Sequence, residues 1–353
     1  MSKTLLRLSR IPRETYESVN ANRENKFGMT TVRLRKLRDA WSEFDWIGGL
    51  RLLQWLEDPL GIVLMSGKRR KQEEYINSHP QFISISKAKD GKDLKIQFAA
   101  LFSRNFLEFY GILDLVKKQY TPETLPYHII VPYLLGYAFS SPPLEGPFSV
   151  QDVAFVLNNL MKGLGFGGGY MAQGGDVGSF VTNALGMYPN ECKLIHLNFR
   201  LSLASASGST ESKKPTDKAF DPLLPLQTFG YALEQGTRPS TIGITVSTNQ
   251  LSLLACIGEK YDACPTLSFS EEVLLRFMSL YWFTHSFSSS IYHYRYMIFW
   301  YRSTSSQRGD AVPKDPHGIQ RFPKYDAGGH FAALAEPEAL WSDIEEIIKE
   351  NWE

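Results

Sequence analysis

The chain has 353 residues, of which 43% are hydrophobic and 21% are charged. This length and composition allow one catalytic domain with a full core and an inserted region. Because 38 basic residues nearly balance 37 acidic ones, the net charge gives no reason to expect a nucleic acid or an anionic membrane as a partner.

The N-terminal part of the sequence predicts one clear hairpin. We expect helical and irregular structure over residues 1 to about 80, where no strand pattern stands out. Strands are predicted over residues 82–86 and 94–102, joined across Asp90-Gly91, a dipeptide typical of a hairpin turn. A further short, buried strand is expected over residues 127–131.

Strands and helices alternate in the middle of the chain. Apolar residues at helical spacing predict a helix over residues 150–164, and short apolar runs predict strands over residues 170–173 and 192–197. This alternation favours a mainly parallel sheet. Residues 205–218, rich in Ser, Gly and Lys, are expected to form a linker, and a helical, aromatic region follows to about residue 300.

One glycine-rich run resembles a cofactor motif. Residues 163–168, GLGFGG, satisfy the G-x-G-x-x-G fingerprint of dinucleotide-binding sites. That fingerprint has to follow a strand and open a helix, whereas this run follows a predicted helix and precedes a predicted strand. The end of a helix and a turn explain the glycines, and we expect no cofactor.

The most informative motif is Gly174-Gly175-Asp176-Val177-Gly178, which lies between a predicted strand and a predicted helix. Its G-x-D-x-G pattern matches a nucleophile elbow with Asp in the place of the nucleophile, and the tight turn is expected to leave no room for side chains at the flanking glycines. A helix N-terminus behind Asp176 would stabilise its charge, which makes the residue a candidate for carboxylate attack on carbon. A plain loop with Asp176 as a turn former is the more common origin of such a run.

A histidine towards the end of the sequence strengthens the elbow interpretation. Gly328-Gly329-His330-Phe331 precedes Glu336-Pro337, where a last helix is expected to begin. A nucleophile, an acid and then a histidine follow one another in this order in α/β hydrolases.

Short motifs spread through most of the chain carry a more specific resemblance. They are Phe44-Asp45-Trp46, His79-Pro80-Gln81-Phe82, Phe106-Leu107-Glu108-Phe109, Gly136-Tyr137-Ala138-Phe139-Ser140, the elbow, Thr237-Arg238-Pro239-Ser240-Thr241-Ile242-Gly243, Ser279-Leu280-Tyr281-Trp282 and Gly328-Gly329-His330-Phe331-Ala332-Ala333-Leu334. In this order they resemble the fungal soluble epoxide hydrolases, which are α/β hydrolases of the microsomal type with an N-terminal extension.

The resemblance implies an α/β-hydrolase fold with a mostly parallel central sheet flanked by helices. The implied division is an N-terminal extension over residues 1–93, the first half of the core over 94–204, a helical cap over 205–300 and the C-terminal part of the core over 301–353.

The resemblance also implies a two-step conversion of an epoxide to a vicinal diol. Asp176 would attack an epoxide carbon to form a glycol ester, and water activated by His330 would hydrolyse that ester. Asp315 would orient His330. Tyr231 and Tyr294 of the cap would donate to the epoxide oxygen.

The sequence departs from the family pattern in three segments. The third core strand and its H-G-x-P turn, whose N–H groups would complete an oxyanion site with that of Val177, are absent, because residues 100–104 lead straight into residues 105–109. Only 14 residues separate Asp315 from His330, and residues 47–71 have no counterpart in the family. These departures are two apparent losses and one gain, and the loss of the strand and its turn predicts an interrupted sheet and slow hydrolysis of the ester.

Alternatives remain for the function and for two of the residue roles. The chain could be another hydrolase with an Asp nucleophile, such as a haloalkane dehalogenase, although Val177 stands where those enzymes often have Trp. It could also be a catalytically impaired or non-catalytic homologue. Other candidates for the roles are Asp310 and Asp326 for the orienting acid and Tyr292 and Tyr296 for the second tyrosine.

The expected partners are a small epoxide, either a xenobiotic or a fungal metabolite, and water, and a homodimer is left open. The three cysteines, Cys192, Cys256 and Cys264, have no metal-ligand spacing and cannot all be paired, which favours a reducing, cytoplasmic location. No apolar stretch approaches the roughly 20 residues of a membrane helix, so no membrane span is expected.

Overall fold

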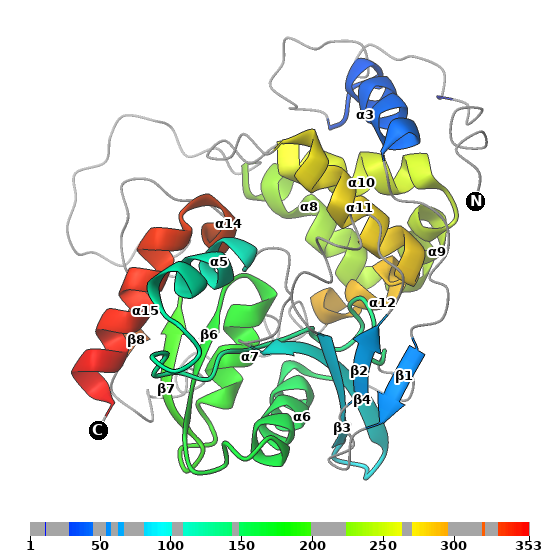
Figure 1. The fold of residues 1–353 in the computed structure, drawn as a ribbon. Helices are drawn as coiled ribbons and strands as arrows, with labels where there is room; N and C mark the ends of the chain where they lie inside the picture. Colours follow the sequence, from blue (N-terminus) through cyan, green and yellow to red (C-terminus); the bar gives the residue numbers. More distant parts are fainter. Residues whose placement is uncertain are drawn as a thin grey trace, which may run out of the picture.

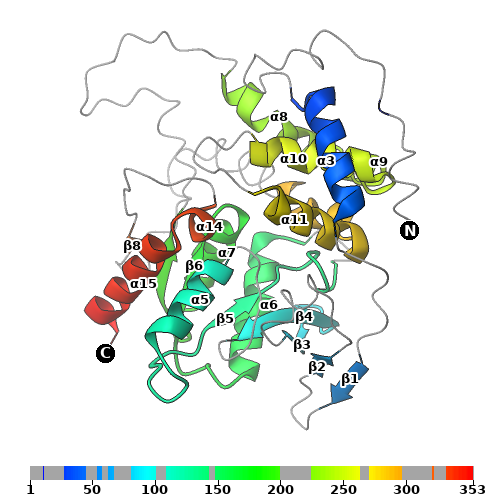
Figure 2. The ribbon, with the colours of Figure 1, turned by 45° about the horizontal axis from the view of Figure 1, so that its top comes forward.

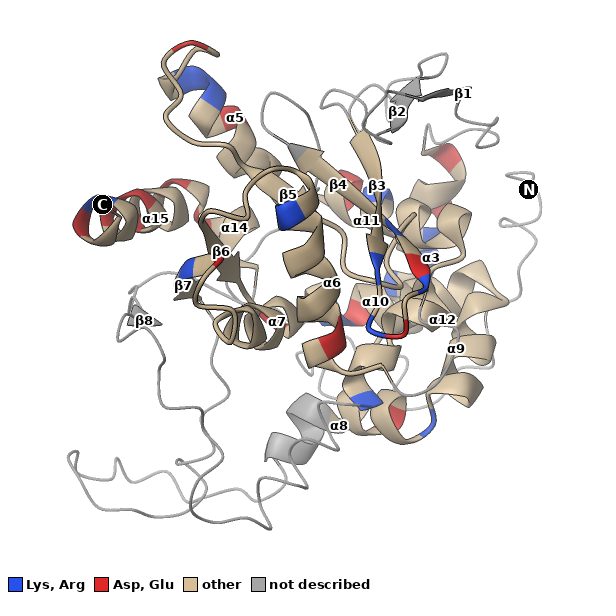
Figure 3. Cartoon of the chain, turned by 90° about the horizontal axis from the view of Figure 1, so that it is seen from below, with Lys and Arg blue, Asp and Glu red and all other residues tan. Residues whose placement is uncertain are grey.

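The computed structural model describes residues 11, 28–44, 54–57, 63–66, 81–100, 109–142, 148–198, 224–262, 270–295, 320–321 and 331–352. In Figure 1 two sheets and their flanking helices form the lower part of the molecule, and helices alone form the upper part. Seen from below, basic and acidic residues are interspersed over the described elements (Figure 3).

The first sheet has five antiparallel strands in the order β1-β2-β3-β4-β5. They are β1 (Gln54–Glu57), β2 (Val63–Ser66), β3 (Gln81–Lys87), β4 (Asp93–Ala100) and β5 (Ile130–Pro132). The predicted hairpin is confirmed, and Gly91 has the positive φ of 83° that its turn requires. The expectation of no strands before residue 80 is wrong at β1 and β2, because four-residue strands are too short for an alternating pattern to stand out.

The second sheet has three parallel strands, β6 (Tyr170–Gly174), β7 (Cys192–Leu197) and β8 (Gln320–Arg321). The predicted strands at residues 170–173 and 192–197 are confirmed. Parallel pairing is confined to this sheet among the described strands. In the first sheet β1 to β4 are neighbours in both sequence and sheet, and strands connected in that way pair antiparallel.

The described strands do not form one continuous sheet, since β5 pairs with β4 and β6 pairs with β7 but β5 and β6 do not pair with each other. An interruption at this point is what the loss of a strand from the segment between β4 and β5 predicts. The expectation of a buried strand over residues 127–131 is wrong in two respects: the strand runs from Ile130 to Pro132, and its residues are half-buried.

Helix α6 (Val150–Gly163) joins the two sheets. It begins in a capping box, in which the Ser149 side chain accepts from the Asp152 N–H and the Asp152 carboxylate accepts from the Ser149 N–H. One hydrophobic core holds residues of α6 together with residues of β4 and of β6. The Tyr170 hydroxyl of β6 also donates to Asn158 of α6 over 2.7 Å.

Four further helices flank the sheets. They are α5 (Tyr110–Gln119), α7 (Val177–Leu185), α14 (Ala332–Ala335) and α15 (Pro337–Asn351). α5 and α15 lie side by side, and α6 and α7 lie against each other on the other side of β6 and β7 (Figures 1 and 3). His196 of β7, which is fully buried, lies with its Nε2 2.7 Å from Oδ2 of Asp343 and so ties α15 to the second sheet.

The upper part holds α3 from the N-terminal region and the helices of the expected cap. They are α3 (Thr31–Glu43), α8 (Leu224–Thr237), α9 (Pro239–Ser247), α10 (Gln250–Asp262), α11 (Glu271–Thr284) and α12 (Phe287–Ser290). α3 packs against α10 and α11 (Figure 2), where Leu37 and Trp41 enter the same core as Leu254 and Met278. In the described part of the chain no single helix is long and apolar enough to cross a membrane, and α9 and α10 meet that test only as a pair bent by 115°.

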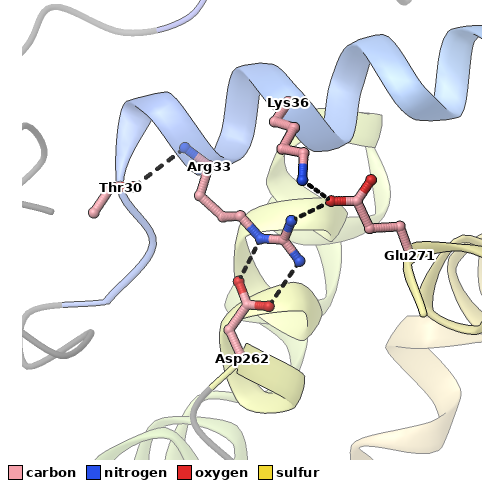
Figure 4. A network of polar contacts seen from close by, with 5 residues as sticks. All are labelled: Thr30, Arg33, Lys36, Asp262 and Glu271. Carbon is pink, nitrogen blue, oxygen red and sulfur yellow. Dashed lines mark hydrogen bonds and ion pairs between the residues drawn. The ribbon is translucent and has the colours of Figure 1, made fainter. Parts of the chain in front are cut away.

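A charged cluster fastens α3 to the helices below it (Figure 4). Arg33 donates through Nε and Nη2 to both carboxylate oxygens of Asp262 over 2.9 Å, and through Nη1 to Glu271 over 2.6 Å. The hydrogen bond to Asp262 raises the pKa of Arg33, so the cation is held there throughout the physiological range. Because Asp262 ends α10 and Glu271 begins α11, one side chain holds the facing ends of two helices.

The expected domain boundaries remain predictions. The boundary after residue 93 would separate β3 from β4, which the structure pairs along the whole of β3.

We expect Arg33→Met to lower the free energy of unfolding by about 1–2 kcal/mol, because two partly buried carboxylates lose their charge-assisted hydrogen bonds. Lys36→Met is the matched control, since the Lys36 side chain is 66% exposed and its ion pair among the described residues is with Glu271. Its effect should stay below about 0.5 kcal/mol. Urea denaturation measures both, and equal losses in the two variants would contradict the role of Arg33.

We expect Asp343→Ala to cost about 1–3 kcal/mol, because it removes the partner of a fully buried imidazole. Ser342→Ala on the exposed face of the same helix should be nearly neutral. Thermal unfolding of the two variants checks this, and a small effect of Asp343→Ala would show that the contact with His196 contributes little to the attachment of α15.

Candidate active site

The elbow motif forms the strand, turn and helix that its spacing predicts. β6 ends at Gly174, α7 begins at Val177, and Asp176 caps α7 with φ 45° and ψ −125°. A non-glycine residue in such a sparsely populated conformation costs on the order of 1–3 kcal/mol. The surrounding contacts must therefore hold the Asp176 backbone in place.

Two of the elbow glycines are required by close contacts. A Cβ at Gly174 would collide with the carbonyl oxygen of Gly178, and one at Gly175 would lie 2.6 Å from Oδ1 of Asn198. The expected crowding is wrong for Gly178 itself, where an added Cβ would meet no described atom within 4 Å. The two flanking positions therefore differ. A side chain at Gly174, at the end of the strand, would meet the backbone of the helix, whereas a side chain at Gly178, in the helix, would meet no described atom.

Polar side chains on both sides of the turn hold it. Ser179 Oγ donates to the Asp176 carbonyl over 2.6 Å. Gln173 Nε2 donates to Asn198 Oδ1 over 2.9 Å, which links the carboxyl ends of β6 and β7. Asn198 was not singled out from the sequence, although a polar residue directly after a strand beside the elbow strand is a usable signal.

Val177 lies at the first position of α7 and is buried. A backbone N–H in the first turn of a helix has no acceptor within the helix, and the helix dipole adds positive potential there. This position suits the oxyanion donor expected from the sequence, and that role remains a prediction.

The two expected tyrosines of the cap lie together. Tyr231 is on α8, and Tyr294 is in the helical turn that follows α12; their ring centroids are 5.7 Å apart in an edge-to-face arrangement of 76°. A hydrogen bond joins the two hydroxyl groups. Tyr292, the neighbouring alternative, is 38% exposed, which favours Tyr294.

The negative charge of Asp176 affects the pKa of both tyrosines. Burial raises the pKa of Tyr231, the negative charge of Asp176 raises it further, and the hydrogen bond with Tyr294 lowers it. Burial and then the Asp176 charge raise the pKa of Tyr294 well above its usual value. The structure therefore brings Asp176, Tyr231 and Tyr294 together, with both phenols protonated at neutral pH.

The loop after β5 holds the turn that carries Tyr294. Ser289 Oγ donates to the Gly136 carbonyl over 2.6 Å. Gly136 has a φ of 86°, and a Cβ at this position would lie 2.6 Å from the backbone carbonyl oxygen of Ser289. His293 donates from Nε2 to the Leu135 carbonyl over 2.7 Å, and burial lowers the pKa of His293, so its imidazole is neutral. The Gly136 motif is thus a docking point for the cap.

The remaining predicted residues are placed as follows. His330 and Asp315, with the alternatives Asp310, Asp326 and Tyr296, lie outside the described residues. Phe331, which follows His330 in the sequence, stacks on Tyr261 of α10 with centroids 4.8 Å apart and planes at 12°.

The glycine-rich run lies in a turn, and the described residues contain no cluster of metal-ligand side chains. The glycine-rich run at residues 163–168 forms the predicted turn between α6 and β6, where Gly165 has φ 92°. No group of three or more His, Cys, Asp and Glu side chains within the described ranges is arranged to hold a metal ion.

Comparison with known proteins gives consistent relatives, although no family profile matches the chain. A protein of Dothistroma septosporum named as an epoxide hydrolase is 32% identical over 98% of this chain and 85% of its own length. That alignment runs over 387 positions, more than the 353 residues present here, so the relative has stretches that this chain lacks. Epoxide hydrolase 1 of Sus scrofa is 26% identical over 91% of this chain and 81% of its own.

Solved structures agree with the sequence relatives. The Aspergillus niger epoxide hydrolase is 35% identical and superposes with a TM-score of 0.76 over 99% of this chain and 92% of its own. The juvenile hormone epoxide hydrolase of Bombyx mori, at 21% identity and a TM-score of 0.69, shares the fold. The chain therefore belongs to the epoxide hydrolase family and has its α/β-hydrolase fold.

Proposed function

We propose that this protein adds water to an epoxide and releases a vicinal diol, by way of an ester on Asp176. The observation that carries the proposal is a pair of half-buried cap tyrosines whose pKa values are raised by burial and by the charge of Asp176, the residue at the strained turn of the elbow. An attacking carboxylate and a proton donor for the ring oxygen are the two groups that epoxide opening needs.

In the first step a carboxylate oxygen of Asp176 forms a bond to an epoxide carbon. The carbon–oxygen bond of the ring breaks, and its electron pair stays on the oxygen, which takes a proton from a cap phenol. Because the pKa values of Tyr231 and Tyr294 are raised, the donors remain protonated up to alkaline pH. On the alkaline side, activity should therefore fall only when the pH rises far enough to remove those protons.

In the second step water attacks the ester carbonyl, with His330 as the base that accepts its proton and Asp315 as the acid that orients His330. The bond between the carbonyl carbon and the diol oxygen then breaks, the diol oxygen takes that proton from His330, and Asp176 returns as a carboxylate. The Val177 N–H stabilises the charge that develops on the carbonyl oxygen. Phe331, which follows His330 in the sequence, stacks on Tyr261 of α10.

The second step is the weaker one in this chain. Each missing oxyanion donor slows such a step by roughly 10²–10³-fold, and the H-G-x-P turn that supplies donors in the family is absent from the sequence. The interrupted sheet favours the second candidate function, a catalytically impaired homologue that forms the ester and releases it slowly. The dehalogenase alternative is disfavoured by the paired tyrosines.

The proposal includes a small epoxide of xenobiotic or fungal origin as the substrate, a cytoplasmic location and a homodimer as the assembly. Cys192 and Cys256 are free thiols, which agrees with a reducing compartment. Burial raises the pKa of Cys192 to about 12 and that of Cys256 to about 11, so neither is an activated nucleophile.

Mass spectrometry of the purified chain with styrene oxide tests the ester. We expect an adduct on the peptide that contains Asp176, with slow release of diol, because ring opening needs only the described groups. Asp176→Asn should abolish the adduct, and Asp90→Asn, in an exposed turn, should leave it unchanged. Rapid diol release without a detectable ester would contradict the impaired second step. No adduct and no diol from a cooperatively folded chain would overturn the proposed function.

The elbow glycines give a second test with a matched control. Gly174→Ala should prevent adduct formation and destabilise the protein, because its Cβ would collide with the Gly178 carbonyl. Gly178→Ala lies in the first turn of α7 with open space around it, and it should keep the adduct while stabilising the helix by up to about 1 kcal/mol. Adduct yield and thermal unfolding are measured together, and equal effects of both variants would contradict this account of the elbow.

A further inference from the structure

Lys260 of α10 lies over the ring of Tyr231. Its Nζ is 4.6 Å from the ring centroid, within the distance at which an ammonium is attracted to an aromatic face. The edge-to-face contact with Tyr294 involves the same ring, so Tyr231 is in contact with a cation and with a second phenol. Among the described residues the cation lies over Tyr231, and none lies over Tyr294.

The ammonium is held in this position from several sides. Lys260 is only 33% exposed, and its Nζ lies 2.9 Å from Oε2 of Glu259. Its neighbour Tyr261 is buried and stacks on Phe331. Asp262, two residues further along α10, accepts hydrogen bonds from Nε and Nη2 of Arg33. The end of α10 that carries Lys260 is therefore anchored to α3 and to the C-terminal part of the chain.

We propose that Lys260 is a positioning residue for epoxide opening, and that its ammonium stabilises the Tyr231 phenolate formed when this phenol gives its proton to the epoxide oxygen. The inference rests on the proposed function. It assigns different roles to the two tyrosines: Tyr231 donates the proton, and Tyr294 supports Tyr231 through their hydrogen bond.

The charges around Tyr231 favour loss of its proton as Asp176 attacks the epoxide. Before the reaction the Asp176 carboxylate opposes loss of the proton, and the hydroxyl of Tyr294 and the ammonium of Lys260 favour it. Glu259 partly offsets the ammonium. As the carboxylate becomes an ester its charge is lost, so the phenolate forms opposite a cation and no longer beside an anion. Water contributes two protons in the second step: one ends on the diol oxygen, and the other, released as Asp176 returns to a carboxylate, restores the phenol.

Titration of Tyr231 tests the inference without any need for turnover. The protein is labelled with tyrosine carrying ¹³C at Cζ, and the Tyr231 resonance is identified by its loss in Tyr231→Phe. Lys260→Met should raise the pKa of Tyr231, because the phenolate loses its cation. Glu259→Gln should lower it, and Lys260→Arg should keep it below that of Lys260→Met. Identical titration curves for wild type and Lys260→Met, both cooperatively folded, would overturn the inference.

The rate of ester formation on Asp176, followed by mass spectrometry in a single turnover, gives the kinetic test. Lys260→Met should slow it roughly 3- to 30-fold, the range that a cation–π contact corresponds to. In the Tyr231→Phe background the same change should have no further effect. Equal slowing in both backgrounds would show that Lys260 acts only through the fold.

The two proposals fail in different ways. An unchanged Tyr231 titration in a wild-type protein that forms the ester rejects the role of Lys260 and leaves the hydrolase function standing. A shifted titration in a protein that forms no ester rejects the function while the contact between Lys260 and Tyr231 holds.

Discussion

The structure depends on the core that α6 shares with both sheets. Because β5 and β6 do not pair, no backbone hydrogen bonds join the strands on either side of the interruption in the described part of the chain. The side chains of α6 pack against β4 and β6 at once, and the Tyr170–Asn158 hydrogen bond adds a polar link. The elbow lies at the end of β6, so its position relative to the first sheet is set by this helix.

Helix α3, from the N-terminal region, holds two helices of the cap in place. Arg33 of α3 holds the facing ends of α10 and α11, and α10 carries Lys260 to the ring of Tyr231. Tyr294 arrives from another direction, on a turn fixed by Gly136 and its loop. The candidate site therefore takes Asp176, Tyr231 and Tyr294 from three segments that are far apart in the sequence, and polar contacts anchor the elbow and the turn that carries Tyr294.

Local patterns predicted the local structures well. Spacing alone predicted the β3–β4 hairpin, α6, β7 and the turn at Asp176, because each depends on neighbouring residues. The tyrosine pair came from the family resemblance, since nothing in the periodicity separates Tyr231 and Tyr294 from packing aromatics. Asn198 and Lys260 were missed because their contacts come from other elements. β1 and β2 were missed because strands of four residues show no period.

The interruption between β5 and β6 also bears on how copies of this chain meet one another. Each of these strands has one hydrogen-bonded neighbour among the described strands, so within the described part of the chain its other edge carries peptide groups oriented for pairing. Such an edge can accept a strand from another molecule while the chain is only partly folded. Recovery of the native protein from denaturant should therefore decline as protein concentration rises, even under conditions that favour the folded state.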